Sequence, residues 1–469
     1  MKIYKANTAR VGLLAAAALL FAFATVAGSG KANAWSLEEA SAPYRGAEID
    51  IICEGYPPCY ALQEVSTEFS EITGITVNFE FGDLLAIAQR MIAEQLTESE
   101  HFDGMQVLSY HLGLFGEQGF TTPMNTFLDD PKLRDPNFDW DNFMPALIAQ
   151  SSMYKGEAIA LPFQYLATFG VIRKDILADS GERAAFKAKY GYDLPEPGLV
   201  TEMPSYEKWG DIAEFFRRDK GETLAGQTLE SDYYGISSPF KRHLTVFWFY
   251  WANLVAHGGE IFDADGELVL GEGTTAVDTV NFLLDMRQYA PPSYREYTWD
   301  EQYRDFCAGL IFSTTFWPDA LYYLEDAAEC ESAGNIGYFV LPETHKSMPF
   351  VYSWVVPPTS ANPEAAFLLM QWALTKDVQT RATPLGWISS TRKDVIAMDW
   401  SHEKQIEGDM AIQKVIADNG WFYALNHHPA LIAVQDIMMD ELSSAGADSI
   451  DAQTAVDNMV ERIREVTQQ

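Results

Sequence analysis

Residues 47–59 read Ala47-Glu-Ile-Asp-Ile-Ile-Cys53 followed by Glu54-Gly-Tyr-Pro-Pro-Cys59. The first half is a short apolar run that predicts a β-strand, and the glycine and prolines mark the second half as a loop. The apolar spacing then predicts a helix, a strand, a helix and a strand over residues 61–72, 76–81, 84–96 and 104–108. This β-α-β-α-β order is typical of a mostly parallel sheet covered by helices on both faces, so the sequence predicts an α/β fold.

The ends of these strands also indicate where a ligand would bind. In parallel α/β sheets, ligands bind beyond the carboxyl ends of the strands. The loop 54–56 follows the first strand, and the loop 109–111 follows the third. We therefore expect these two loops to form walls of a binding site.

The rest of the chain continues this alternation up to its C-terminal helices. We expect strands over 158–162, 168–173, 310–313 and 336–340, and helices over 209–216, 276–289, 363–374 and 451–466. No internal repeat or long low-complexity linker separates these segments. Two domains would therefore exchange chain several times instead of dividing at one boundary.

The first 34 residues have the pattern of an export signal. Three basic residues precede an almost uninterrupted apolar run over 11–27, and Ala32-Asn33-Ala34 is an A-x-A cleavage site. An uncleaved membrane anchor is the alternative, because the apolar run is near the lower length limit for spanning a bilayer. We expect a mature protein that begins near Trp35 and works in the periplasm.

Composition and charge exclude several classes of protein. The chain has 469 residues, is 48% hydrophobic and carries 32 Lys and Arg against 67 Asp and Glu, a formal net charge of −35. The apolar content supports a large folded core, and the charge repels nucleic-acid backbones and anionic lipid headgroups. We therefore expect a folded protein with no nucleic-acid partner.

Four cysteines lie in the part expected to be exported, where disulfides persist. Three pairings are possible. We expect Cys53 to pair with Cys59 and Cys307 with Cys330, because each pair closes a short loop. A zinc site is the weaker interpretation, since C-x5-C is a looser pattern than zinc ligands show and no histidine lies beside either pair.

Seven fragments carry a resemblance to a known family. In chain order they are His101-Phe-Asp-Gly-Met-Gln-Val-Leu108, Gly119-Phe-Thr-Thr-Pro-Met124, Tyr154-Lys-Gly-Glu-Ala-Ile-Ala-Leu-Pro162, Val171-Ile-Arg-Lys-Asp175, Leu254-Val-Ala-His-Gly-Gly-Glu-Ile-Phe-Asp263, the run from Gly309 to Trp317, and Ser360-Ala-Asn-Pro-Glu-Ala-Ala366. Each fragment is weak alone, but their order over about 400 residues is a strong signal. The chain resembles the carbohydrate-type extracellular solute-binding proteins of ABC importers, the family of the maltose-binding protein.

The resemblance implies a two-lobed periplasmic-binding-protein type II fold, an α/β architecture with multiple hinge crossovers that closes on a ligand. By similarity, the crossovers lie near 164–168, 342–346 and 383–389. The expected first lobe comprises residues 47–165 and 344–385, and the expected second lobe comprises residues 166–343 and 386–469. Ser353-Trp354 departs from the Gly-Gly often found at that place in the family, so a contact there would be bulkier or different in kind.

A carbohydrate site needs aromatic plates for the flat apolar faces of the sugar and polar or carboxylate side chains for its hydroxyls. The expected contacts are Glu54, Tyr56, Tyr110, Gln164, Tyr165, Trp248, Trp317, Trp354 and Trp387. The resemblance places Trp248 and Trp317 where the family holds an aromatic ring against the sugar, and Gln164 and Tyr165 at the first crossover. Core packing is the alternative for each aromatic residue, and solvent exposure is the alternative for Glu54.

Other chemical motifs are weak. Asp263-Ala-Asp265-Gly266 begins like a calcium loop, but the required Gly belongs at the sixth position and Thr274 holds the twelfth, so we expect a turn. His427-His428 precedes Pro429, and adjacent side chains point apart, which favours a structural or solvated pair over a metal site. We therefore expect no metal and no cofactor.

The leading interpretation is the solute-binding component of an ABC importer. It would capture a carbohydrate or polyol between two lobes and deliver it unaltered to the membrane permease, as a monomer without enzymatic activity. Two alternatives stay open. One is a binding protein for a cationic solute such as a polyamine, because an acidic aromatic cleft also suits cations. The other is a secreted glycosidase, because paired carboxylates are set in space and not in sequence.

Overall fold

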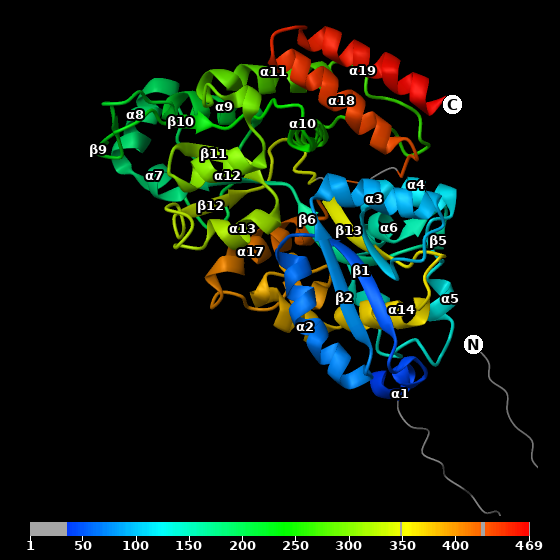
Figure 1. Ribbon diagram of the computed structural model, residues 1–469. Helices are drawn as coiled ribbons and strands as arrows, with labels where there is room; N and C mark the ends of the chain where they lie inside the picture. Colours follow the sequence, from blue (N-terminus) through cyan, green and yellow to red (C-terminus); the bar gives the residue numbers. More distant parts are fainter. Residues whose placement is uncertain (1–34, 348, 424–426, 469) are drawn as a thin grey trace, which may run out of the picture. The chain divides into compact units, whose positions relative to one another are not determined.

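A computed structural model describes residues 35–347, 349–423 and 427–468 (Figure 1). The expected export signal, residues 1–34, lies outside the described residues. Within the described ranges, no helix has both the length and the apolar character needed to cross a bilayer.

A five-stranded sheet contains the predicted β-α-β-α-β segment. Its strand order is β2 (Thr76–Gly82), β1 (Glu48–Glu54), β3 (Gly104–Leu108), β13 (Pro349–Val355) and β6 (Leu161–Ala167). β1 is parallel to β2 and β3, as the sequence predicts, whereas β13 is antiparallel to both β3 and β6. β13 differs because it enters from the second sheet through a loop, without the crossover helix that usually precedes a parallel strand.

A four-stranded sheet forms the second layer of strands. Its order is β10 (Tyr234–Ile236), β11 (Ile311–Phe316), β7 (Phe169–Arg173) and β12 (Ile336–Phe339). β10 and β11 are parallel, and β7 is antiparallel to both β11 and β12. This sheet is therefore mixed, whereas the sequence predicts mostly parallel pairing.

The strand expected over residues 158–162 is divided in two. β5 (Glu157–Ala158) pairs with β4 (Met153–Tyr154) in a hairpin, and β6 begins only at Leu161. The two residues of the hairpin turn, Lys155 and Gly156, both have positive φ, which is the backbone form of the tight turns that join antiparallel strands. The local hairpin therefore takes Ala158 away from the sheet.

Helices cover both sheets. Around the five-stranded sheet lie α1 (Leu37–Ser41), α2 (Pro57–Thr73), α3 (Leu84–Leu96), α4 (Leu112–Gln118), α5 (Asn125–Leu128), α6 (Pro145–Ser151), α14 (Pro363–Ala373) and α15 (Lys376–Ala382). With the four-stranded sheet lie α7 (Lys174–Ala178), α8 (Ser180–Tyr190), α9 (Tyr206–Phe216), α12 (Trp299–Cys307), α13 (Pro318–Leu324), α16 (Lys393–Ile396) and α17 (Lys404–Asn419). A small hairpin, β8 (Thr223–Leu224) with β9 (Gln227–Thr228), follows α9.

Four further helices, one of which is α10, pack on one another. α10 (Leu244–Ala256) is buried along its whole length, because its sequence is apolar on every face. It packs against α11 (Thr275–Met286) and α18 (Leu431–Gly446), and α18 packs against α19 (Ala452–Thr467). Figure 1 shows α18 and α19 beside α10 and α11, so the C-terminal helices complete a core that the middle of the chain begins.

The chain passes between the two sheets three times. The single residue Thr168 separates β6 in the first sheet from β7 in the second. Residues 340–347 follow β12 on the way back to β13, and the segment 383–392 leads from α15, which packs on α2, to α16 and then α17, which packs on β12 of the second sheet. Both sheets are therefore held together by three short connections.

Both expected disulfides are present. Cys53–Cys59 joins the end of β1 to the first turn of α2 across 6 residues of sequence. Cys307–Cys330 joins the end of α12 to the segment before β12 across 23 residues. All four sulfur-bearing side chains are buried, so these bonds belong to the cores of the two layers.

Removing the longer disulfide should destabilise the protein more than removing the shorter one. A cross-link restricts the unfolded chain more when it closes a longer loop, which predicts losses of about 3 kcal/mol for Cys307→Ser/Cys330→Ser and about 2 kcal/mol for Cys53→Ser/Cys59→Ser. Urea denaturation without reductant measures both. A wild-type free energy of unfolding in the first double variant would contradict the prediction.

Candidate functional site

A cavity of about 920 Å³ lies between elements of the two sheets. From the side of the five-stranded sheet it is lined by Glu54, Gly55, Tyr56, Pro57, Tyr60, Phe81, Gly82, Asp83, Leu84, Leu108, Leu166 and Tyr352. From the side of the four-stranded sheet and its helices it is lined by Trp248, Trp299, Asp300, Tyr303, Phe316, Trp317, Asp319, Ala320, Tyr322, Tyr323, Asp326 and Glu329. The cavity is therefore walled by segments far apart in the sequence.

The two walls use the same local sequence signal. β1 is followed by Tyr56 and then Pro57, which starts α2, and β11 is followed by Trp317 and then Pro318, which starts α13. In each case the aromatic residue is extended and the proline occupies the first helical turn, where its missing N–H has no intrahelical partner to lose. This combination turns an aromatic ring toward the cavity at the carboxyl end of a strand.

Aromatic rings form plates on both walls. Trp248 stacks on Trp299 with ring centroids 5.7 Å apart and meets Trp317 edge-on at 5.5 Å. On the opposite wall, Tyr56 and Tyr352 lie 5.2 Å apart. Such surfaces suit the C–H faces of a sugar or polyol.

Glu54 is the most strongly perturbed acid of the cavity wall. It ends β1, and its carboxylate accepts a hydrogen bond from the Tyr352 hydroxyl. Burial, helped by the negative charges of Asp319 and Asp83 and opposed by the Tyr352 hydrogen bond, raises the pKa of Glu54 to about 8. At neutral pH this carboxyl is therefore mostly protonated and can donate as well as accept.

Three of the other five carboxylates that line the cavity lie near helix N-termini. Asp83 caps α3 and accepts from the N–H groups of Leu85 and Ala86 at 3.0 and 3.4 Å. Asp300 and Asp319 lie in the first turns of α12 and α13. Burial raises the pKa of Asp319 to about 6, while N–H groups of its own helix oppose that rise. The positive ends of these helices partly offset the acidic charge of the cavity.

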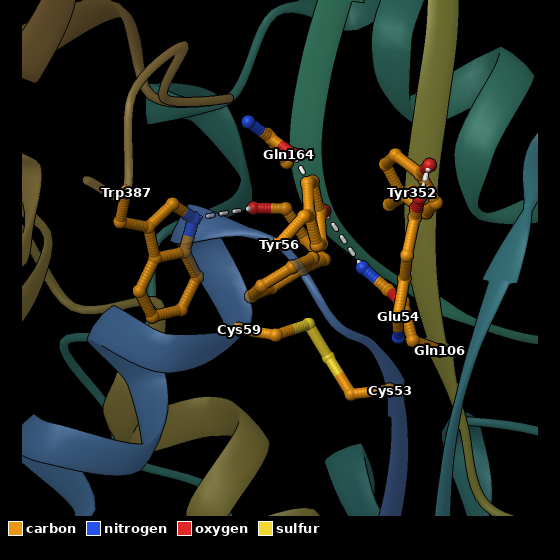
Figure 2. The surroundings of a disulfide bond; sticks show 9 residues. Cys53, Glu54, Tyr56, Cys59, Gln106, Gln164, Tyr352 and Trp387 are labelled. Atoms are coloured by element: carbon orange, nitrogen blue, oxygen red, sulfur yellow. Dashed lines mark hydrogen bonds between the residues drawn. A yellow bond between two sulfur atoms is a disulfide. The ribbon is translucent and has the colours of Figure 1, made fainter. Parts of the chain in front are cut away.

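Four of the nine expected contact residues line this cavity, namely Glu54, Tyr56, Trp248 and Trp317. Glu54 and Tyr56 belong to the loop 54–56 that the sequence marks as a wall. Figure 2 shows this loop, with the Cys53–Cys59 disulfide closing it and Tyr56 between the amides of Gln106 and Gln164. The disulfide therefore restrains the loop that presents Tyr56.

The structure does not bring the other five residues to the cavity. Tyr110 lies behind Trp248, edge-on at 6.5 Å, within a buried turn, so the expected wall at 109–111 is absent. Gln164 and Tyr165 are buried in β6, where Tyr165 packs against Phe422. Trp354 and Trp387 both pack on the ring of Phe163, and the Trp387 indole donates to the Phe163 carbonyl at 3.3 Å. These four residues are buried in the core beneath the crossovers, where β6 pairs with β13 at one side of the five-stranded sheet.

Sequence reasoning missed several lining residues, among them Trp299, Asp319 and Tyr352. Asp319 could have been found from the shared aromatic-proline signal, since it lies two residues after Trp317. Trp299 follows Thr298, whose capping box with Glu301 starts α12. Tyr352 had no local signal, because its direction is set by the pairing of β13 with β3 and β6.

The weak motifs take structural roles. The segment from Asp263 is a turn in which the Asp263 carboxylate accepts from the N–H groups of Asp265 and Glu267, each at 2.9 Å. His427 lies 3.1 Å from the Ser109 carbonyl, and the His428 ring stacks on Phe262. In the described ranges, no group of three or more His, Cys, Asp or Glu residues is arranged to hold a metal ion.

Comparisons with known proteins agree on one family. The family model for bacterial extracellular solute-binding proteins matches residues 60–380. The chain is 24% identical over 308 residues to the mannitol-binding protein of Pseudomonas aeruginosa, covering 62% of this chain and 60% of that one. It is 21% identical over 350 residues to the erythritol/L-threitol-binding protein of Mycolicibacterium smegmatis, covering 73% and 69%.

A solved structure gives the same fold. It is an ABC transporter solute-binding protein from Agrobacterium radiobacter K84 in complex with ribitol, with a TM-score of 0.73 and 19% identity over 90% of this chain and 99% of that one. The expected two-lobed α/β fold is thereby confirmed.

The raised pKa of Glu54 predicts how stability depends on pH. Between its ordinary pKa and about 8, the unfolded chain releases the proton that the folded protein keeps, so the free energy of unfolding falls as pH rises through this range. Glu54→Gln removes this dependence. At pH 9 its free energy of unfolding should exceed that of wild type by about 2 kcal/mol. This difference is smaller than the full pKa shift would give, because the Glu54 side chain is only partly buried. The two proteins should be closest at pH 4.5.

Urea denaturation of ligand-free protein at several pH values measures this difference. Asp409, whose pKa burial raises to about 6 and which does not act on Glu54, contributes equally to both proteins, so its effect cancels in the difference. Parallel stability curves for wild type and Glu54→Gln between pH 5 and 9 would show that Glu54 is ionised in the folded protein.

Proposed function

The chain belongs to the bacterial extracellular solute-binding protein family, and we propose that it captures a carbohydrate or polyol for an ABC importer. One observation carries the choice of solute: aromatic plates from two separate walls face a single cavity that also holds hydrogen-bonding carboxyl groups. Ring faces bind the C–H surface of such a solute, and carboxyl groups bind its hydroxyls. The names of the two relatives, which specify mannitol and erythritol/L-threitol, support a polyol.

The size of the cavity supports capture by closure. Small-molecule sites have volumes of roughly 300–1,000 Å³, and the cavity, at about 920 Å³, is near the upper end. A polyol of four to six carbons would leave room, so we propose that the two lobes approach each other around it. The expected lobe boundaries after residues 165, 343 and 385 stay a prediction.

A cationic solute is the second candidate, because six carboxyl groups and no Lys or Arg side chain are among the described residues that line the cavity. Two features favour the neutral solute. Glu54 is mostly uncharged at neutral pH, and Asp83, Asp300 and Asp319 lie at helix N-termini, whose partial positive charge offsets theirs. We therefore propose a neutral polyol over a polyamine.

The proposed setting follows from the family. The protein would act in the periplasm, as a monomer, and present the closed form to the membrane permease of the importer. A glycosidase would release a changed product, whereas the proposed protein returns its ligand unaltered. Chromatography of the ligand recovered after denaturing the complex separates these two functions.

Binding should be measured by calorimetry with mannitol, ribitol and erythritol, and with spermidine as the cationic probe. We expect at least one polyol to bind and spermidine to bind more weakly or not at all. Tight binding of spermidine without polyol binding would assign the cavity to a cationic solute.

Trp317→Ala should weaken polyol binding by roughly 1–3 kcal/mol, because it removes one of the aromatic plates. Trp400→Ala is the matched control, since Trp400 is 5% exposed and Trp317 is 6% exposed, but only Trp317 lines the cavity. Calorimetry should show near wild-type affinity for the control, which loses stability instead. Equal affinities for both variants would remove Trp317 from the site.

A further inference from the structure

A chain of hydrogen bonds leads from the cavity wall into the third crossover. The Glu54 backbone N–H donates to Gln106 Oε1 at 2.9 Å, and Gln106 Nε2 donates to the Tyr56 hydroxyl at 2.7 Å. The Tyr56 hydroxyl donates to Gln164 Oε1 at 2.7 Å, and Gln164 Nε2 donates to the Ile388 carbonyl at 3.1 Å. These hydrogen bonds therefore join two cavity-lining residues to a segment that links the two sheets; Figure 2 shows the part from Gln106 through Tyr56 to Gln164.

The direction of every bond in this chain is fixed at both ends. A backbone N–H can only donate, so Gln106 must present its oxygen to Glu54 and its NH₂ group to Tyr56. A backbone carbonyl can only accept, so Gln164 must present its NH₂ group to Ile388 and its oxygen to Tyr56. The Tyr56 proton therefore points to Gln164, and Tyr56 has no second proton to give a ligand.

The last acceptor in this series of hydrogen bonds, the Ile388 carbonyl, lies in a constrained part of the crossover. Ser389, next to Ile388, has a φ of +57°, a left-handed conformation that serine rarely adopts. Its N–H and its hydroxyl both donate to the buried Asp409 carboxylate at 2.8 Å, and its carbonyl accepts from the Tyr165 N–H at 3.0 Å. Asp409 belongs to α17, which packs on α13, the helix that carries Asp319 on the opposite wall of the cavity.

We propose that Gln164 is a positioning residue for ligand capture: it ties the ring of Tyr56 to the crossover at Ile388, so that the wall and the hinge segment keep one geometry. Gln164 is fully buried and does not line the cavity, so it acts only through Tyr56. Its role rests on the proposed function, because it is defined by ligand capture in that cavity.

Gln379, in the helix α15 that leads into the same crossover, is a matched control. It is as buried as Gln164, and its side chain also bonds to the crossover: its Nε2 donates to the Ala373 carbonyl, and its Oε1 accepts from the hydroxyl of Ser390 in the crossover. Neither partner lines the cavity. A substitution at Gln379 therefore perturbs the hinge core without touching the chain that leads to Tyr56.

The first test compares Gln164→Met, Gln379→Met, Tyr56→Phe and the double variant Tyr56→Phe/Gln164→Met, using calorimetry with mannitol, or with ribitol if mannitol does not bind to wild type. We expect Gln164→Met and Tyr56→Phe each to weaken binding about tenfold and the double variant to lose little more, because both changes break the same hydrogen bond. Gln379→Met should lower the melting temperature but keep affinity within about twofold of wild type. Wild-type affinity in Gln164→Met, or additive losses in the double variant, would overturn the proposal.

The second test needs no ligand and so separates this proposal from the proposed function. Tyr56→Phe should increase amide hydrogen exchange across residues 386–392 several-fold, whereas Tyr60→Phe, a cavity-lining tyrosine outside the chain of hydrogen bonds, should not. This second test also applies if Gln164→Met does not fold, because Tyr56→Phe removes the same Tyr56–Gln164 hydrogen bond from the side of the cavity. Unchanged hydrogen exchange in Tyr56→Phe would overturn the proposed coupling between Tyr56 and the crossover, even if polyols bind. Increased exchange in a protein that binds no polyol would refute the proposed function but not this coupling.

Discussion

The three passages of the chain between its two sheets link the two walls of the cavity. Thr168 alone separates β6 from β7, so the two sheets are joined there through a single residue. Cavity-lining residues such as Tyr56 and Trp317 come from strand ends on either side of these connections. Movement between the two walls must therefore be absorbed within a few residues, which suits hinge closure.

Three of the acidic side chains that line the cavity lie beside helix N-termini. The overall charge of −35 would make an open acidic cavity attractive to cations. In the cavity itself, one acid is kept protonated by burial and three others meet the positive ends of α3, α12 and α13. Acidic composition and the proposed neutral ligand are thus compatible, since carboxyl groups are able to form hydrogen bonds with hydroxyls.

Local pattern predicted the elements well where they are consecutive. The helix over 84–96 and the strand over 104–108 have the bounds expected from sequence, and both disulfides follow the rule of closing short loops. The antiparallel pairing of β13 could not be predicted from the sequence, because pairing between strands distant in the chain does not affect the local apolar periodicity. The aromatic residues expected at the cavity could not be sorted for the same reason, because tertiary packing decides which of them face it. Trp317 lines the cavity, whereas Trp387 packs on Phe163 beneath the crossovers. Hydrophobic character alone does not distinguish a ligand plate from a core residue.

Small-angle X-ray scattering with and without a bound polyol tests capture between two lobes most directly. If the solute is held between the two walls, saturation with a polyol shown by calorimetry to bind should lower the radius of gyration, and Trp317→Ala at subsaturating ligand should show a smaller decrease. A radius of gyration that stays unchanged at full saturation would mean that the ligand binds without closure, and the account of the cavity as a closing cleft would be wrong.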